Sequence, residues 1–199
     1  MTEPQTGRIQ RVTVFTGSKH GNTDAYVEAA ETFAHALADR GFGVVFGGGD
    51  VGLMGVVADA ALAAGAEVYG VIPESMLATE VPHQTLTQLE IVADMHTRKH
   101  RMAELGDAFV ALPGGIGTLE EFFEIWTWQQ LGLHTKPVAL FNVAGFWDPL
   151  LAIIDHMAAQ GFVRRSFTEA LIVESTPEAI IAALQSWQPP PKRAPVPQH

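Results

Sequence analysis

Two acidic residues follow a glycine-rich turn in the stretch LPGGIGTLEEFFEIWTW, residues 112–128. The glycines allow backbone N–H groups to converge, and a helix that begins beside them adds a partial positive charge, so the turn can bind a phosphate. A tight structural turn with Thr118 as the helix N-cap explains the same letters equally well. Glu121 has capping-box spacing from Thr118, so this pattern alone favours a capping role for at least one of Glu120 and Glu121.

A basic cluster lies upstream, in DMHTRKHRMAEL, residues 94–105, where Asp94 is the expected N-cap of a helix. Arg98 stands three residues after Met95 and four before Met102, which places it on the apolar, inward stripe of that helix. A charge in that position needs a partner or a ligand. Glu121 is the natural candidate, and a purely structural buried ion pair is the alternative. We favour a functional site, because both residues are expected at the ligand-binding edge of a sheet.

A second glycine loop, GGGDVG at residues 47–52, matches GxGxxG after a predicted strand and before a predicted helix. Taken alone, it suggests a dinucleotide site with Glu74 as a ribose ligand. The signal is weak, because glycines in short strand–helix turns are often structural. The chain has no GxxxxGK[ST] sequence, which argues against a P-loop NTPase.

The histidines and serines do not form a recognisable catalytic or metal-binding pattern. His96 and His100 share a helical face but lack a third ligand, so we interpret them as polar surface and predict no metal site. The remaining histidines are scattered, and none forms a triad with Ser18, Ser75 or Ser166. Metal and nucleophilic-serine mechanisms are therefore disfavoured.

Short β-branched runs alternate with helical runs, which predicts an α/β fold with a Rossmann-like, doubly wound parallel sheet and helices on both faces. Ligands bind at the carboxyl ends of the strands in such sheets, and every glycine cluster of this chain lies at such an end. The expected strands are RVTVFTG, GVVFGGG, EVYGVIP, LEIVA, DAFVALPGG and KPVALFN, and the expected helices span about residues 23–40, 53–65, 94–105, 118–131, 147–160 and 177–187.

Length and composition limit the possible classes of protein. The 199 residues predict one domain at residues 11–187, between a flexible N-terminus (1–10) and a proline-rich flexible tail (188–199). A net charge of −10 disfavours nucleic acid and anionic membranes as partners, and no segment has the length of a membrane span. The absence of cysteine fits a cytoplasmic protein. An apolar fraction of 47% against 17% charged residues suggests an oligomer.

Four segments in this order, TGSKHG, GGGDVGLMG, MHTRKHRM and PGGIGTLEE, resemble the LOG (Lonely Guy) family of cytokinin-activating phosphoribohydrolases. Some members carry an old lysine-decarboxylase label. The similarity extends over residues 12–173. It implies a Rossmann-like fold, a homodimer or larger homo-oligomer with active sites near the interface, and no cofactor. The implied reaction hydrolyses the N-glycosidic bond of AMP or N6-substituted AMP to the free base and ribose 5-phosphate.

The resemblance also implies site residues. The family's catalytic arginine in HxRK and second glutamate in TxEE fall on Arg98 and Glu121. Cleaving a ribosyl C1′–N bond builds positive charge on the sugar, which a carboxylate stabilises while it activates water. Thr16 stands where many members have cysteine, which affects loop contacts rather than the mechanism. The expected substrate-binding residues are Gly17, Ser18, Glu80, Lys99, Gly115, Ile116, Gly117, Thr118, Leu119, Glu120 and Thr127.

Two other functions compete with this interpretation. A non-enzymatic nucleotide or molybdenum-cofactor carrier would share the glycine loops, but it would not need both Arg98 and Glu121. An NAD-dependent oxidoreductase would use GGGDVG, but it leaves PGGIGT unexplained and has no evident acid–base residue for hydride transfer.

Overall fold

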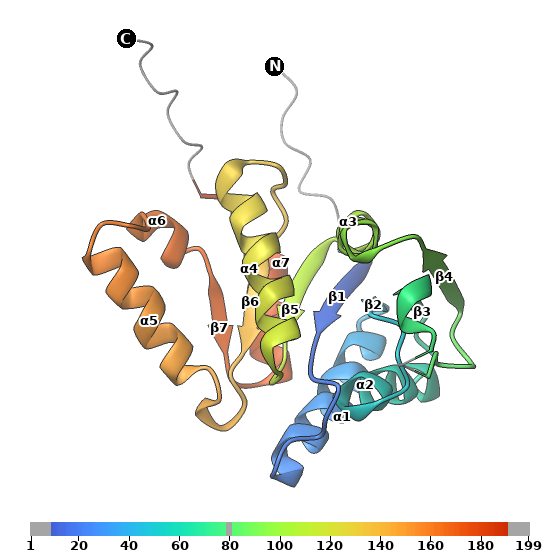
Figure 1. The fold of residues 1–199 in the computed structure, drawn as a ribbon. Helices are drawn as coiled ribbons and strands as arrows, with labels where there is room; N and C mark the ends of the chain where they lie inside the picture. The colour runs from blue at the N-terminus through green and yellow to red at the C-terminus, as the bar shows by residue number, and fades with distance from the viewer. Residues whose placement is uncertain (1–8, 79–80, 191–199) are drawn as a thin grey trace.

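Seven parallel strands form one sheet in the computed structural model, which describes residues 9–78 and 81–190 (Figure 1). Their order across the sheet is β4-β3-β2-β1-β5-β6-β7. Most of the predicted flexible ends, residues 1–10 and 188–199, lies outside the described residues. The strands are β1 (Arg11–Phe15), β2 (Gly43–Phe46), β3 (Val68–Pro73), β4 (Gln88–Val92), β5 (Ala108–Ala111), β6 (Val138–Phe141) and β7 (Ile172–Glu174).

Helices cover both faces of the sheet, as predicted (Figure 1). One buried apolar cluster joins the sheet to α1, α2 and α7, and a second joins its other face to α3, α4 and α5. The helices are α1 (Asp24–Asp39), α2 (Gly52–Ala63), α3 (Met95–Leu105), α4 (Ile116–Leu131), α5 (Asp148–Ala159), α6 (Arg165–Thr168) and α7 (Pro177–Ser186), with short 3-10 turns η1 (Glu74–Met76) and η2 (Val143–Gly145).

The central strands are continuous apolar runs because both of their faces are covered. In β2, Val44 packs into the cluster beneath α1 and α2, while Val45 packs into the cluster beneath α3 and α4. The edge strand β7 was not predicted. It has only three residues, of which Ile172 alone is buried, so its pattern is too short to distinguish it from a loop. Within the described residues, no helix combines the length and apolar character that a membrane crossing requires.

The first four strands build the sheet outward from β1 to β4, and the last three build it outward on the other side of β1, beginning with β5. The order of the strands therefore reverses between the neighbours β1 and β5. Loops that follow strands on the two sides of such a switch point separate and leave a crevice for ligands. Here the loop after β1 is tied to the loop after β5 at its base. The Gly17 N–H and the Thr16 hydroxyl both donate to the carbonyl of Pro113, at 3.2 and 3.1 Å. The crevice above these bonds is the candidate site.

Candidate active site

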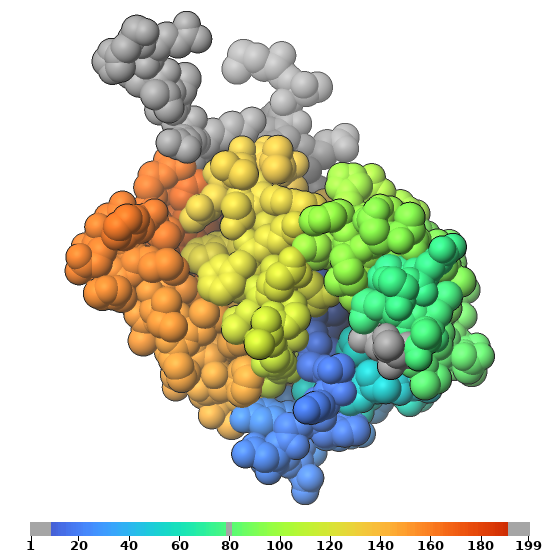
Figure 2. Space-filling view, viewed as in Figure 1, coloured from blue at the N-terminus to red at the C-terminus, as the bar shows by residue number. Residues whose placement is uncertain are grey.

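A cleft of about 260 Å³ opens at the switch point. In Figure 2 the surface is hollowed where the blue loop after β1 meets the yellow-green start of α4. The cleft joins five segments that are distant in the sequence: the loop after β1, the start of α2, η1, the start of α3 and the start of α4. Its lining residues are Thr16, Gly17, Ser18, Met54, Met76, Met95, Arg98, Gly115, Ile116, Gly117, Thr118, Glu120 and Glu121.

The N-terminus of α4 faces this cleft without a side-chain cap. Its N-cap is Gly115, which has no side chain, and the amide of Leu119 bonds to the Gly115 carbonyl at 3.1 Å to close the first helical turn. Thr118 is therefore a buried residue inside the helix, and the capping role considered for it is wrong. Glu121 lies beyond the first turn, so it does not belong to a capping box. The amides of the first turn and the helix dipole are chemically suited to an anion at this end.

The glycines of this loop fall into two groups. A Cβ on Gly114 would lie 2.1 Å from the hydroxyl oxygen of Thr118 and 2.9 Å from the amide nitrogen of Gly17, so Gly114 is required for packing. A Cβ on Gly115 or Gly117 would meet no protein atom within 4 Å. Packing therefore does not explain the last two glycines, whereas the close approach of a ligand to the backbone does.

Arg98 enters the cleft from α3, and its side chain is 5% exposed, as its place on the inward stripe predicted. Its Nε donates to the Val71 carbonyl at 3.1 Å and its Nη2 donates to the Gly47 carbonyl at 3.0 Å. Its Nη1 lies 3.7 Å from the sulfur atoms of Met76 and Met95. These neutral acceptors fix the guanidinium in place, and none of them carries a negative charge. Glu121, the predicted partner of Arg98, lines the same cleft.

The GGGDVG loop serves this arginine and not a dinucleotide. A Cβ on Gly47 would lie 1.9 Å from Nη2 of Arg98, so the first glycine makes room for the guanidinium. The N-terminus of α2 is covered by the loop after β1. The amide of Leu53 donates to the Gly17 carbonyl at 3.0 Å, and a Cβ on Gly52 would lie 2.2 Å from the carbonyl carbon of Ser18. A pyrophosphate has no room at this helix end, which contradicts the NAD interpretation.

Lys99 follows Arg98 but is directed elsewhere. Its side chain is buried, and its Nζ forms ion pairs with Glu120 and, at 3.0 Å, with Glu124, both on α4. Burial alone would lower the pKa of Lys99, but the hydrogen bonds and charges of the two carboxylates outweigh burial and raise the pKa above its ordinary value. Lys99 is therefore a charged link between the helices that carry Arg98 and Glu121.

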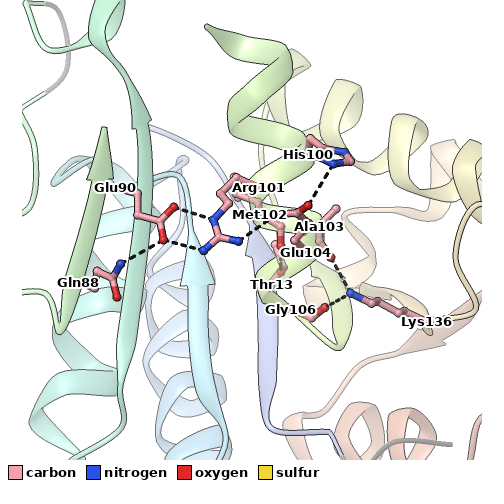
Figure 3. A network of polar contacts seen from close by, with 10 residues as sticks. All are labelled: Thr13, Gln88, Glu90, His100, Arg101, Met102, Ala103, Glu104, Gly106 and Lys136. Carbon is pink, nitrogen blue, oxygen red and sulfur yellow. Dashed lines mark hydrogen bonds and ion pairs between the residues drawn. The ribbon is translucent and has the colours of Figure 1, made fainter. Parts of the chain in front are cut away.

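The opposite side of α3 is held by a polar network (Figure 3). Arg101 makes a bidentate contact with Glu90 on β4, at 2.7 and 3.0 Å, and a further bond to Glu104 at 2.9 Å. The hydrogen bond from Arg101 holds the pKa of Glu90 below its ordinary value. This contact fixes the face of α3 that is turned toward the sheet edge.

The C-terminal end of α3 is capped by a lysine from the loop before β6 (Figure 3). The Nζ of Lys136 donates to the carbonyls of Ala103 and Gly106, at 2.7 and 2.6 Å. Cations are favoured at this end of a helix. Burial lowers the pKa of Lys136. Together with the cap of Asp94 on the Thr97 amide, at 2.8 Å, these bonds fix α3 at both ends.

One cluster of metal-ligand types lies beside the site. Donor atoms of Asp50, Asp59 and His83 all lie within 4.8 Å of one another. The Nδ1 of His83 accepts from the Thr85 amide, so the proton of the neutral ring lies on Nε2, which faces Asp59 at 3.1 Å. This arrangement is a hydrogen bond between a histidine and a carboxylate, and it does not present a free nitrogen to a metal.

The structure brings most of the predicted site residues to the cleft. Leu119 is half-buried beside it, Thr127 is exposed further along α4, and neither lines it, nor does Lys99. Glu80 lies outside the described residues. The residues that line the cleft are Arg98, Glu121, Gly17, Ser18, Gly115, Ile116, Gly117, Thr118 and Glu120.

Sequence reasoning missed the three cleft methionines, Met54, Met76 and Met95. In the sequence, Met95 indicated the apolar stripe of α3 but not a place in the cleft. The position in the sequence was an available signal for two of them, because Met76 and Met95 each follow the last residue of a strand by three residues, whereas Met54 lies in α2, eight residues after β2.

Comparisons with known proteins show the family of this chain. The family model described as "Possible lysine decarboxylase" matches residues 54–184. The cytokinin riboside 5'-monophosphate phosphoribohydrolase of Rhodococcoides fascians is 50% identical over 176 residues, 88% of this chain and 89% of that protein. The enzyme LOG3 of Arabidopsis thaliana, with the same activity name, is 40% identical over 185 residues, 93% of this chain and 86% of that protein.

Solved structures show the fold alone, because their sequences are distant. A molybdenum cofactor binding protein of Rippkaea orientalis superimposes with a TM-score of 0.67 at 21% identity, over 90% of this chain and 97% of its own. The molybdenum cofactor carrier protein of Chlamydomonas reinhardtii gives 0.68 at 19% identity, over 89% and 97%. Identity to the curated enzymes over most of both chains decides the assignment: the chain belongs to the LOG family.

Proposed function

We propose that this protein hydrolyses the N-glycosidic bond of N6-substituted adenosine 5′-monophosphates, and of AMP itself, to the free base and ribose 5-phosphate. The observation that carries the proposal is the presence in one cleft of Arg98, Glu121 and the uncapped N-terminus of α4. The activity for which the curated relatives are named supports it.

The 5′-phosphate binds at the start of α4. The amides of Ile116, Gly117 and Thr118 belong to the first turn of α4, where amides have no acceptor within the helix, and Gly115 and Gly117 leave the space above them open. The hydroxyl of Ser18, across the cleft, can donate a further hydrogen bond. A phosphate in this position lies about one helical turn from Glu121, so the ribose is directed toward that carboxylate.

Glu121 acts on the sugar. As the C1′–N bond lengthens, its electron pair moves to the base and positive charge develops on the ribose. The carboxylate stabilises that charge and accepts a proton from the attacking water, whose oxygen bonds to C1′. The departing base takes up a proton, so that one nucleotide and one water give one base and one ribose 5-phosphate. Arg98 contributes a fixed positive charge that orients Glu121 and offsets the charge of the phosphate.

The base occupies the apolar part of the cleft. Met54, Met76 and Met95 approach it from three different elements. Thioether side chains are polarisable, adapt their shape and pack well against aromatic rings. Such a wall accommodates adenine and an apolar N6 substituent.

A homodimer and a cytoplasmic location complete the proposal. The dimer is supported by Leu131 and Leu133 at the end of α4, which are 62% and 68% exposed. Light scattering of the purified protein tests it, and a monomeric mass at micromolar concentration would contradict it. The location follows the cysteine-free composition.

Product analysis by chromatography tests the reaction. The purified protein is incubated with N6-isopentenyl-AMP, with AMP and with N6-isopentenyladenosine, which lacks the phosphate. We expect free base from both monophosphates and at least about 100-fold less from the nucleoside, because the phosphate site supplies positioning. Free lysine is tested as a control substrate, because the matching family model is described as a possible lysine decarboxylase. We expect it to remain intact, since no lysine side chain of the described residues lines the cleft. Intact nucleotides with folded protein would favour the carrier interpretation.

A further inference from the structure

Lys99 and Arg98 are consecutive in α3, yet they serve different surroundings. Arg98 lines the cleft, whereas Lys99 does not. The Lys99 side chain is 7% exposed, and its ammonium group contacts Glu120 and Glu124, one turn apart on α4. The family resemblance implies that this lysine contacts the substrate, but in this structure its ammonium group already forms ion pairs with two carboxylates.

We propose that Lys99 is a positioning residue, which clamps α3 to α4 and balances the acidic charge next to Glu121, and not a ligand of the substrate. This inference rests on the proposed function, because it concerns the same catalytic pair.

The clamp spans a seam between two helices. α3 packs mainly on the strands β1 to β4, while α4 packs on β1 and β5. Contacts that join the two helices directly include the Lys99 ion pairs and the edge-on contact of His100 with Trp128, at 6.1 Å between ring centroids. Since Arg98 belongs to one helix and Glu121 to the other, the separation of this catalytic pair depends on that seam.

The clamp also sets the charge around Glu121. α4 carries carboxylates at positions 120, 121 and 124. Of the ionisable side chains described, Arg98 and Glu120 line the cleft with Glu121, and the loop after β1, the start of α2 and η1 line it with non-ionisable residues only. Lys99 forms ion pairs with Glu120 and Glu124, so its removal takes away the positive charge that balances their two negative charges beside Glu121. Added negative charge disfavours the ionised form of a carboxyl group.

Three variants test the clamp: Lys99→Met, Glu124→Gln and the double variant. Glu124 does not line the cleft, and its side chain is 24% exposed. Lys99→Met should lower kcat at least about tenfold, change KM less than about threefold, and move the acid limb of the pH profile of kcat to higher pH. Adding Glu124→Gln should recover most of kcat and return the acid limb toward its wild-type position. Lys99→Gln replaces Lys99→Met if the apolar variant does not fold.

Arg40→Met is the matched control, because it also removes one positive charge. Arg40 is exposed at the C-terminal end of α1, three residues before β2 begins. It therefore lies near the amino-terminal ends of the strands, whereas the cleft lies at their carboxyl ends. This variant should leave kcat and the acid limb unchanged.

A rise in KM of at least about tenfold that Glu124→Gln does not rescue would make Lys99 a substrate ligand and overturn the clamp. If the wild-type protein cleaves no nucleotide, the proposed function fails, and the clamp is judged by urea unfolding of the same variants. Destabilisation by Lys99→Met that Glu124→Gln reverses would support the clamp, and additive effects of the two changes would overturn it.

Discussion

The α-carbon of Gly47 lies against the guanidinium of Arg98. The carbonyl of Gly47 accepts a hydrogen bond from Nη2 at 3.0 Å, and a Cβ on the same residue would lie 1.9 Å from that nitrogen. Gly47 follows β2, and Arg98 lies in α3, 51 residues later. The first glycine of GGGDVG therefore determines where the cationic group of the cleft can lie.

Gly47→Ala should displace Arg98 and lower kcat about 100-fold, the magnitude expected when a positioned charge is lost. The backbone of Gly47 does not have a positive φ, so alanine strains only the contact with the guanidinium. Steady-state kinetics of Gly47→Ala, Arg98→Ala and the double variant measure this effect. The double variant should be no slower than Arg98→Ala alone, because both changes remove the same interaction. Additive losses would show that Gly47 acts independently.

Glu121→Gln should lower kcat at least about 100-fold, because the amide neither accepts a proton nor stabilises positive charge on the ribose. Its free energy of unfolding should change by less than about 1 kcal/mol, since Glu121 lies beyond the first turn of α4 and does not cap it. Single-turnover kinetics and urea unfolding check the two halves of this prediction. Near-normal turnover would remove Glu121 from the mechanism.

Gly117→Ala should weaken phosphate binding without harming the fold. Its Cβ would meet no protein atom within 4 Å, and alanine is a better helix former by up to about 1 kcal/mol. The Cα–Cβ bond of a helical residue tilts toward the helix N-terminus, which is where the phosphate is proposed to bind. KM for the monophosphates should rise at least about tenfold, while the melting temperature stays the same or rises. Gly114→Ala is the contrast, because its Cβ clashes with Thr118 and should destabilise the protein.

Local patterns in the sequence predicted much of this structure. Apolar runs indicated six of the strands, and Asp94 was correctly predicted as the cap of α3. The inward position of Arg98 followed from helical spacing, and its burial confirms it. These features depend on neighbours within one or two turns, which periodicity reports directly.

Features that depend on contacts between distant segments were not predictable in this way. The contact of Gly47 with Arg98 and the bond of Lys99 to α4 are set by how the strands and helices pack. The role of Thr118 was misjudged because the helix begins two residues earlier, at Ile116. Helix starts are among the least certain features of a sequence pattern.

Glu90→Gln should make stability less dependent on pH. The hydrogen bond from Arg101 lowers the pKa of Glu90 in the folded protein, so the unfolded chain binds its proton more readily. The stabilisation is therefore present above the unfolded pKa, near 4.5, and is lost as the pH falls through the lower folded pKa. We expect a loss of about 1 kcal/mol at pH 7, a modest value because the Arg101 side chain is partly exposed and the pair is screened by solvent.

Urea unfolding at several pH values between 7 and 3 measures this difference between the wild-type protein and Glu90→Gln. The difference should shrink as the pH falls, because the wild-type carboxyl group becomes protonated and loses its charged contact with Arg101. Glu28→Gln, on the exposed side of α1, removes the same charge and should show no such trend. A constant difference between wild type and Glu90→Gln at every pH would mean that packing, and not the ion pair, fixes α3 to β4.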